Sequence, residues 1–113
     1  MESILTTIKK LLGITEEYKH FDDDIKVHIN MVLMTLNQIG IGPDDPYVVT
    51  SEMETWDDFL KEAKHLEAVK TYVYLKVRLA FDPPANSSLI EAINRQISEL
   101  EWRLNVVAET KAN

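Results

Sequence analysis

The sequence predicts an all-α fold, a compact bundle of four to five helices with one long loop at residues 41–54. Three observations support this fold class. Apolar residues recur three and four positions apart along most of the 113-residue chain, as on the buried face of a helix. Residues that start and stop helices flank these segments. Hydrophobic residues make up 45% of the chain and charged residues 27%, which is normal for a globular domain.

Two helices are predicted in the first part of the chain, at residues 3–12 and 22–39. Lys9 and Lys10 fall in the last turn of the first helix, where positive charge complements the helix dipole. Three successive aspartates open the second helix and Gly40 ends it. Three residues widen the apolar surface of the second helix: Val27, Met31 and Met34.

The middle of the chain is predicted to hold the loop, a short helix and a long apolar helix. Residues 47–49 could form a short strand inside loop 41–54. Thr55 is expected to cap a short helix over residues 55–63. The next helix, 65–81, is apolar around so much of its circumference that it should lie at the centre of the fold or under a neighbour. A double proline then ends it.

The last helix is predicted over residues 88–107. Ser88 and Glu91 match a capping box, in which each side chain satisfies a free backbone N–H. Trp102 lies off the main apolar seam and could equally pack inside the chain or contact a partner subunit. The seam itself is too short for an independent coiled coil and is expected to pack within the chain's own core. It consists of Ile90, Ile93, Ile97, Leu100, Leu104 and Val107.

The chain is predicted to form a single helical domain over residues 1–108, followed by a flexible tail at 109–113. It has no cysteine, which excludes disulfides, thiolate metal sites and cysteine catalysis. The first residues lack the apolar core of a signal peptide, and no apolar run approaches the roughly 20 residues that span a bilayer. We therefore expect a soluble protein that is not secreted by a classical route.

The acidic charge is concentrated in the first half of the chain. Residues 1–60 carry four basic and twelve acidic residues, a net charge of −8, whereas residues 61–113 carry eight basic and seven acidic residues, a net charge of +1. An acidic surface should not hold DNA or RNA through phosphates, because like charges repel. It is therefore either a solvated face, a surface for a basic partner, or a surface that lets DNA pass.

No catalytic residue, cofactor or metal ligand is predicted. The acidic groups at 22–24 and 44–45 lack the central glycine and distant glutamate of a calcium loop. The three glycines form no phosphate-binding loop, and no serine sits in the setting of an activated nucleophile. The histidines lack the spacing of a helical zinc pair: His20, His28 and His65.

Three carboxylates invite comparison with all-helical, magnesium-dependent nucleotide hydrolases: Glu62, Glu67 and Asp82. Those enzymes need paired carboxylates that face each other from two helices. Glu62 and Glu67 are five positions apart and therefore point to different sides of one helix. The pattern supports this enzyme class only weakly.

The segment LEAVKTYVYLKVRLAFDPP, followed by ISELEWRLNV, resembles the small head–tail connector proteins of long-tailed bacteriophages, also called adaptor or DNA-packaging proteins. The N-terminal segments IKKLLGI and FDDDIKVHINMVLMTLNQIGIG resemble the same family. The resemblance covers nearly the whole chain, and loop 41–54 and the residues after Val107 match least well.

The resemblance implies a structural protein of the virion neck that performs no chemistry and is made in the bacterial host cytoplasm. Its expected partners are the portal protein, a head-closure (stopper) or tail-completion protein, and copies of itself in a ring, expected to be a dodecamer on the portal. DNA would pass through the channel without specific binding, and no membrane is involved. Two alternatives stay open: a small helical metal-dependent nucleotide hydrolase, or a helical regulator that binds a host protein.

The resemblance also suggests where contacts should lie. Acidic residues of the long loop are expected to line the channel or face the next neck protein: Asp44, Asp45, Glu52 and Glu54. Residues of the last helix are expected to contact the portal or a neighbouring subunit, with Trp102 and Arg103 foremost: Ile97, Leu100, Trp102, Arg103, Leu104 and Val107.

Overall fold

The computed structural model describes residues 2–61 and 63–112 of the chain. Within these ranges no segment forms a strand, which confirms the predicted all-α fold. A 3-10 turn at Ala63–His65 leads into the fourth helix. The α-helices are α1 (Ile4–Leu11), α2 (Asp22–Ile39), α3 (Trp56–Phe59), α4 (Leu66–Phe81) and α5 (Ser87–Ala112).

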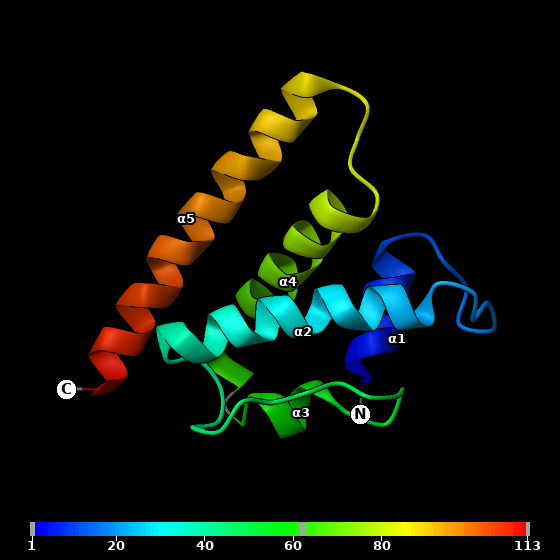
Figure 1. The fold of residues 1–113 in the computed structure, drawn as a ribbon. Coiled ribbons are helices and arrows are strands. Elements are labelled where there is room, and N and C mark those ends of the chain that lie inside the picture. Colours follow the sequence, from blue (N-terminus) through cyan, green and yellow to red (C-terminus); the bar gives the residue numbers. More distant parts are fainter. Residues whose placement is uncertain (1, 62, 113) are drawn as a thin grey trace.

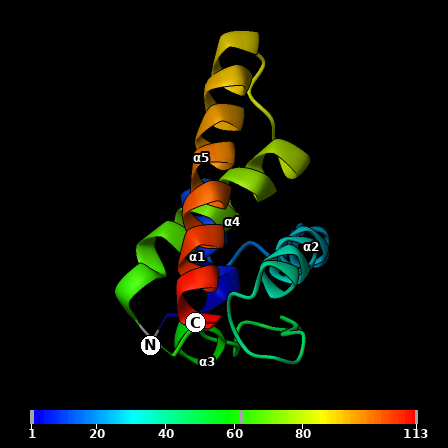
Figure 2. The same cartoon turned by 90° about the vertical axis from the view of Figure 1, so that its left-hand side faces the viewer.

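Helix α4 lies at the centre of the bundle. Its most extensive contacts are with α2 and α5. Figure 1 shows α2 crossing in front of α4, with α5 running diagonally beside it, and Figure 2 brings α5 forward and leaves α2 to the right. Val69, Tyr72, Val73 and Val77 of α4 are fully buried, as the apolar circumference of this helix predicts. The radius of gyration is 13.9 Å, close to the roughly 13 Å expected for a domain of this length.

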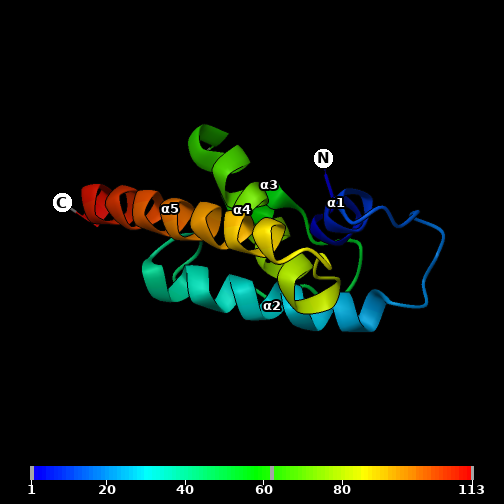
Figure 3. The same ribbon diagram turned by 90° about the horizontal axis from the view of Figure 1, so that it is seen from above.

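The N-terminus and helix α3 are tied together by backbone hydrogen bonds. The amide of Ile4 donates to the Glu54 carbonyl at 3.0 Å, and the amide of Trp56 donates to the Glu2 carbonyl at 3.1 Å. The Trp56 side chain is buried, and its Nε1 donates to Thr7 Oγ1 at 3.1 Å. In Figure 3 α2 runs along one edge of the molecule, with α1 and α3 on the other side.

The strand predicted at residues 47–49 is wrong. These residues form no strand, and the isolated β-bridge of the described chain joins Ser3 and Thr55 instead. The Asn30 side chain takes the place of a partner strand. Its Oδ1 accepts from the Val49 amide at 2.8 Å and its Nδ2 donates to the Val49 carbonyl at 3.0 Å.

Helix α5 differs from its prediction at both ends. It begins at Ser87, and Asn86 rather than Ser88 caps it: Asn86 Oδ1 accepts from the Ser88 amide at 2.8 Å and the Leu89 amide at 3.3 Å. At the other end the helix continues through the predicted tail to Ala112, and residue 113 lies outside the described residues. The flexibility of this tail and the domain boundary at 108 stay predictions.

The remaining helix ends follow local chemistry. Ser3 Oγ accepts from the Thr6 amide at the start of α1, and Thr55 Oγ1 accepts from the Asp58 amide at the start of α3. Helix α3 stops at Phe59 and is shorter than predicted. Gly40 ends α2 with φ of +105°, a left-handed conformation that residues other than glycine rarely adopt.

Candidate interaction surfaces

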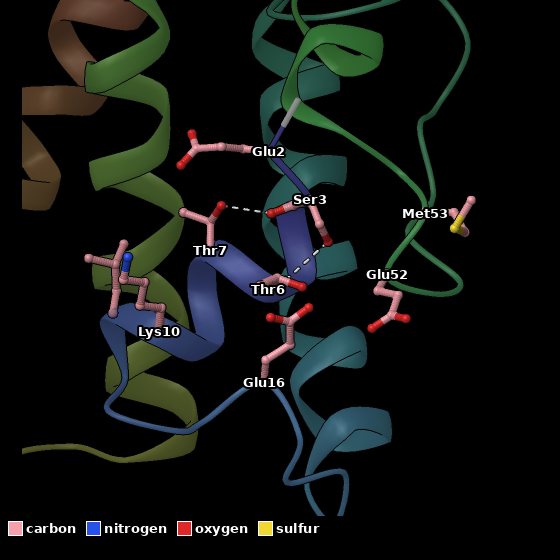
Figure 4. Close-up of a pocket in the computed structure, with 9 residues that line it drawn as sticks. Glu2, Ser3, Thr6, Thr7, Lys10, Glu16, Glu52 and Met53 are labelled. Carbon is pink, nitrogen blue, oxygen red and sulfur yellow. Dashed lines mark hydrogen bonds between the residues drawn. The ribbon is translucent and has the colours of Figure 1, made fainter.

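A hollow of about 590 Å³ lies beside α1 and is drawn in Figure 4. Glu16 and Glu52 approach it from the connector and the loop, whereas Glu2 extends toward α4 and pairs with Lys70. Glu52 pairs with Lys19 at 3.2 Å. Glu16, the third acidic residue beside the hollow, forms no ion pair with any described residue.

The hydroxyl groups beside this hollow serve the backbone. Ser3 Oγ accepts from the Thr6 amide at 3.2 Å, and Thr7 Oγ1 donates to the Ser3 carbonyl at 2.7 Å. No histidine is among its described lining residues, so neither hydroxyl has an adjacent imidazole to remove its proton. The hollow is an open groove between α1 and residues 52–53, and several of its side chains make contacts within the chain.

The carboxylates considered for a nucleotide hydrolase do not converge. Glu67 forms an ion pair with Lys70 at 3.6 Å near the start of α4, and Asp82 caps the other end of the same helix. These two positions are about 22 Å apart along the helix axis. Glu62 lies outside the described residues. Within the described parts of the chain, no group of three or more His, Cys, Asp or Glu residues is placed to hold a metal ion.

Two of the three histidines contact aromatic rings. The ring of His20 lies edge-on to Phe21 at 4.8 Å between centroids, and Phe21 in turn contacts Phe81 at 5.3 Å. His28 of α2 also faces Phe81, at 6.3 Å. These contacts join the connector before α2 to the end of α4. They are packing contacts and bring no two histidines together as ligands.

The predicted interface on α5 divides into buried and exposed residues. Ile97 and Leu104 are 7% and 1% exposed and belong to the core, and Leu100 and Val107 pack against that core. Burial removes Ile97 and Leu104 from any surface that the folded subunit presents. Trp102 is 67% exposed, and Arg103 is also exposed, with its Nη2 2.6 Å from Glu99 Oε1. Contact of this helix with a portal stays a prediction.

The four acidic loop residues also separate into two kinds. Asp44 and Asp45 are exposed and take part in no ion pair within the described chain, whereas Glu52 pairs with Lys19. Glu54 turns inward onto its own loop. Its carboxylate accepts from the amides of Thr50 and Ser51 at 3.1 and 2.9 Å, and from both of their hydroxyls.

These hydrogen bonds change the acidity of Glu54. Burial by itself would raise the pKa of this carboxyl, but the hydrogen bonds from Ser51 and Thr50 outweigh burial and lower the pKa below its ordinary value of 4.5. Glu54 therefore holds residues 50–54 in shape as a carboxylate, and it is less available to a channel or neck partner than Asp44 and Asp45.

A buried lysine is the main feature that sequence reasoning missed. Lys9 is 2% exposed. Its Nζ donates to the carbonyls of Tyr18 at 2.7 Å and Glu16 at 3.1 Å, and lies 2.8 Å from Asp22 Oδ1. That oxygen makes no hydrogen bond of regular geometry, so the pair acts chiefly through charge. Leu5 and Lys9 are four residues apart on one helix face, a spacing from which burial could have been inferred.

The outer surfaces of α2 and α5 each carry exposed apolar side chains. On α2, Val27, Met31 and Met34 are 61%, 61% and 52% exposed. On α5, Trp102 is joined one turn later by Val106, which is 42% exposed. Contiguous exposed apolar side chains of this size are typical of protein–protein contacts. No helix of the described chain is long and apolar enough to cross a membrane.

Fold and surfaces together define a class: a small all-helical domain in which several polar side chains hold the loops and some apolar side chains of α2 and α5 are exposed. The family model described as "phage connector protein" matches residues 4–111. The chain belongs to this family of phage connector proteins, which confirms the resemblance. Comparison with curated proteins and with solved structures gave no match.

Family membership supports a structural connector role and a non-enzymatic function. It implies contact with portal or neck components of a phage in general, and it suggests a place in the neck of the virion.

Proposed function

We propose that this protein is the head–tail connector of a long-tailed bacteriophage. It forms a ring, a dodecamer, beneath the portal, extends the DNA channel and docks the head-closure (stopper) or tail-completion protein. It is made in the cytoplasm of the bacterial host and ends in the neck of the virion. The match of residues 4–111 to phage connector proteins carries this proposal.

The exposed apolar side chains support a role in assembly. A ring subunit needs exposed apolar surface in addition to the surface buried in its own core, because each copy must bind two neighbours. Met31 on α2 and Trp102 on α5 are 61% and 67% exposed and lie on different helices of the bundle. Of the predicted interface residues of α5, Trp102 and Arg103 are exposed and available to a portal or to a neighbouring subunit.

The acidic surface supports a conduit for DNA. Asp44 and Asp45 are exposed and carry no ion pair among the described residues, so their charge is free to repel a phosphate backbone. We assign these two residues to the channel or to the surface that faces the next neck protein. DNA then passes without being held.

Electron microscopy of particles from a phage in which the gene is disrupted tests the connector role. We expect filled or leaking heads beside separate, complete tails, and normal particles when the wild-type gene is supplied in trans. Normal, tailed, infectious particles without the gene would contradict the proposal. They would leave a regulator of a host protein as the function to examine.

Charge reversal tests the assignment of the loop. Particles carrying Asp44→Lys and Asp45→Lys together should eject DNA more slowly or assemble an altered neck. The matched control is Glu16→Lys with Glu17→Lys, the same charge change on the exposed connector before α2. Normal ejection and plaque formation by the loop variant, or an equal defect in the control, would remove the loop from the channel.

A further inference from the structure

Helix α2 presents an outward strip that is apolar in its middle and acidic at its start. Asp24, Val27, Met31 and Met34 follow one another at helical spacing and are all exposed. The strip continues to Gln38 and contains no basic residue. Nothing in the described chain covers it, although its three apolar side chains are each more than half exposed.

Helix α5 presents a second outward strip with the opposite charge at its start. Arg95, Glu99, Trp102 and Val106 share one exposed face. Glu99 is neutralised within the strip by Arg103 at 2.6 Å. Arg95 is an exposed basic residue of this face that forms no ion pair in the part of the chain that the structure describes, so its charge is available to a partner.

The two strips match in spacing and in charge. Asp24 precedes Met31 by seven residues, and Arg95 precedes Trp102 by seven residues, which places each charge about 10 Å from its apolar partner along the helix. If the helices lie parallel with Asp24 beside Arg95, the Met31 thioether meets the Trp102 ring, a favourable sulfur–aromatic contact. Asp24, like Arg95, has no ion pair among the described residues.

We propose that the α2 strip of one copy binds the α5 strip of the next copy, with the two helices parallel. The inference rests on the proposed ring and names the surfaces that form it. Two different faces of one chain produce a head-to-tail contact, which closes into a ring or extends into a filament. Helices α2 and α5 lie at different places on the bundle, so each copy can use both faces at once (Figures 1 and 2).

Other pairings of the two strips form fewer favourable contacts. Two α2 strips in parallel would bring the aspartates of both copies together, and like charges across a contact are unfavourable. Two α2 strips in antiparallel orientation would leave Arg95 unpaired and Trp102 in water. An antiparallel α2–α5 pair would separate Asp24 from Arg95 and place Asp24 near Glu109. The parallel α2–α5 pair buries both apolar strips and brings Asp24 together with Arg95.

The absence of cysteine in the chain makes the contact testable by cross-linking. Met31→Cys and Trp102→Cys in one chain should give, on oxidation, a ladder of dimers, trimers and larger covalent oligomers. Each single variant should give none, because the two cysteines of a contact come from different strips. Met31→Cys with Met53→Cys is the matched control: Met53 is 77% exposed but lies in the loop, so no ladder is expected. Thermal unfolding of each variant shows that it folds.

The cross-linking is done on concentrated purified protein and on particles assembled with the variant. A dimer from Met31→Cys alone would overturn the inference in favour of paired α2 strips. Absence of the ladder from particles that contain the protein would also overturn it, while leaving the connector role intact. If particles lack the protein, the connector proposal fails, and a ladder from the purified chain supports the contact by itself. Absence of the ladder from both samples overturns the inference.

Discussion

The irregular segments of the N-terminal half and the α4–α5 hairpin are held in place by different chemistry. The connector between α1 and α2 is held by Lys9, whose ammonium donates to two carbonyls of the connector. Loop 41–54 is held by Asn30, whose side chain binds both the amide and the carbonyl of Val49. The hairpin instead closes on the apolar seam of α5, with Ile97 and Leu104 buried against the core. Glu101 adds polar contacts to it: Tyr72 Oη donates to Glu101 Oε2 at 2.7 Å, and Lys76 Nζ lies 3.9 Å from the same oxygen.

The difference follows from where backbone hydrogen bonds are satisfied. A helix satisfies its own amides and carbonyls, so helices can meet through apolar side chains alone. An irregular segment has no such internal partners, and its buried backbone groups need side chains to bind them. In this protein a few polar side chains therefore determine the path of the irregular segments in the N-terminal half. Many apolar contacts together hold the α4–α5 hairpin.

Removal of a seam residue should have the largest effect on stability. We expect Leu104→Ala to lower the free energy of unfolding by about 3 kcal/mol, because it leaves a cavity at a fully packed site. Trp102→Ala is the control on the same helix and should change it by less than about 0.5 kcal/mol, since that side chain is exposed. Urea unfolding of the dilute protein measures both. Equal losses would show that the seam is not the part of α5 that packs.

Removal of the buried lysine comes next. We expect Lys9→Ala to lower the free energy of unfolding by about 2 to 3 kcal/mol, because Asp22 and two backbone carbonyls lose their partner. The value lies below that of a fully buried pair because the Asp22 side chain keeps 17% of its surface exposed. Lys10→Ala, one position later and exposed, should be nearly neutral. Equal free energies of unfolding for the two variants would mean that Lys9 contributes no more to stability than an exposed lysine.

Loss of the loop clamp should cost somewhat less. Asn30→Ala removes two hydrogen bonds and leaves the amide and carbonyl of the buried Val49 unpaired, a loss of about 2 kcal/mol. Hydrogen exchange at the Val49 amide should accelerate more than exchange in α4. Asn105→Ala, which removes a bond to its own helix, is the control and should leave both rates unchanged. Unaltered protection at Val49 would mean that another group holds the loop.

The smallest effect is expected at Glu54 and should depend on pH. Because the folded-state pKa of Glu54 is lowered, the charged carboxylate contributes stability that is present above the unfolded pKa near 4.5 and is lost as pH falls through the folded value. At pH 7, Glu54→Gln should cost about 1 kcal/mol, from weaker hydrogen bonds to residues 50 and 51. The difference from wild type should shrink in urea titrations toward about pH 3. A difference that is constant with pH would assign the loss to shape and not to charge.

Local patterns were enough to predict the helices but not every boundary. Gly40 and the three aspartates before Ile25 mark the ends of α2 as predicted, because a cap depends on neighbours within one turn. At the start of α5 two polar residues, Asn86 and Ser88, could cap the helix, and the side chain of Asn86 does so. The strand predicted at residues 47–49 failed for a related reason, since strand pairing requires a distant partner and Asn30 supplies one of another kind.

The sequence by itself determined the helix order, the apolar circumference of α4 and the apolar seam of α5, because each depends on the spacing of residues within one segment. The tertiary structure decided which polar residues lie inside and which apolar residues lie outside. Lys9 is buried and Trp102 is exposed, against the usual preference of each residue type. Such a choice depends on which segments meet in space. Lys9 contacts residues seven to thirteen positions away, and the buried Trp56 donates to Thr7, forty-nine positions away.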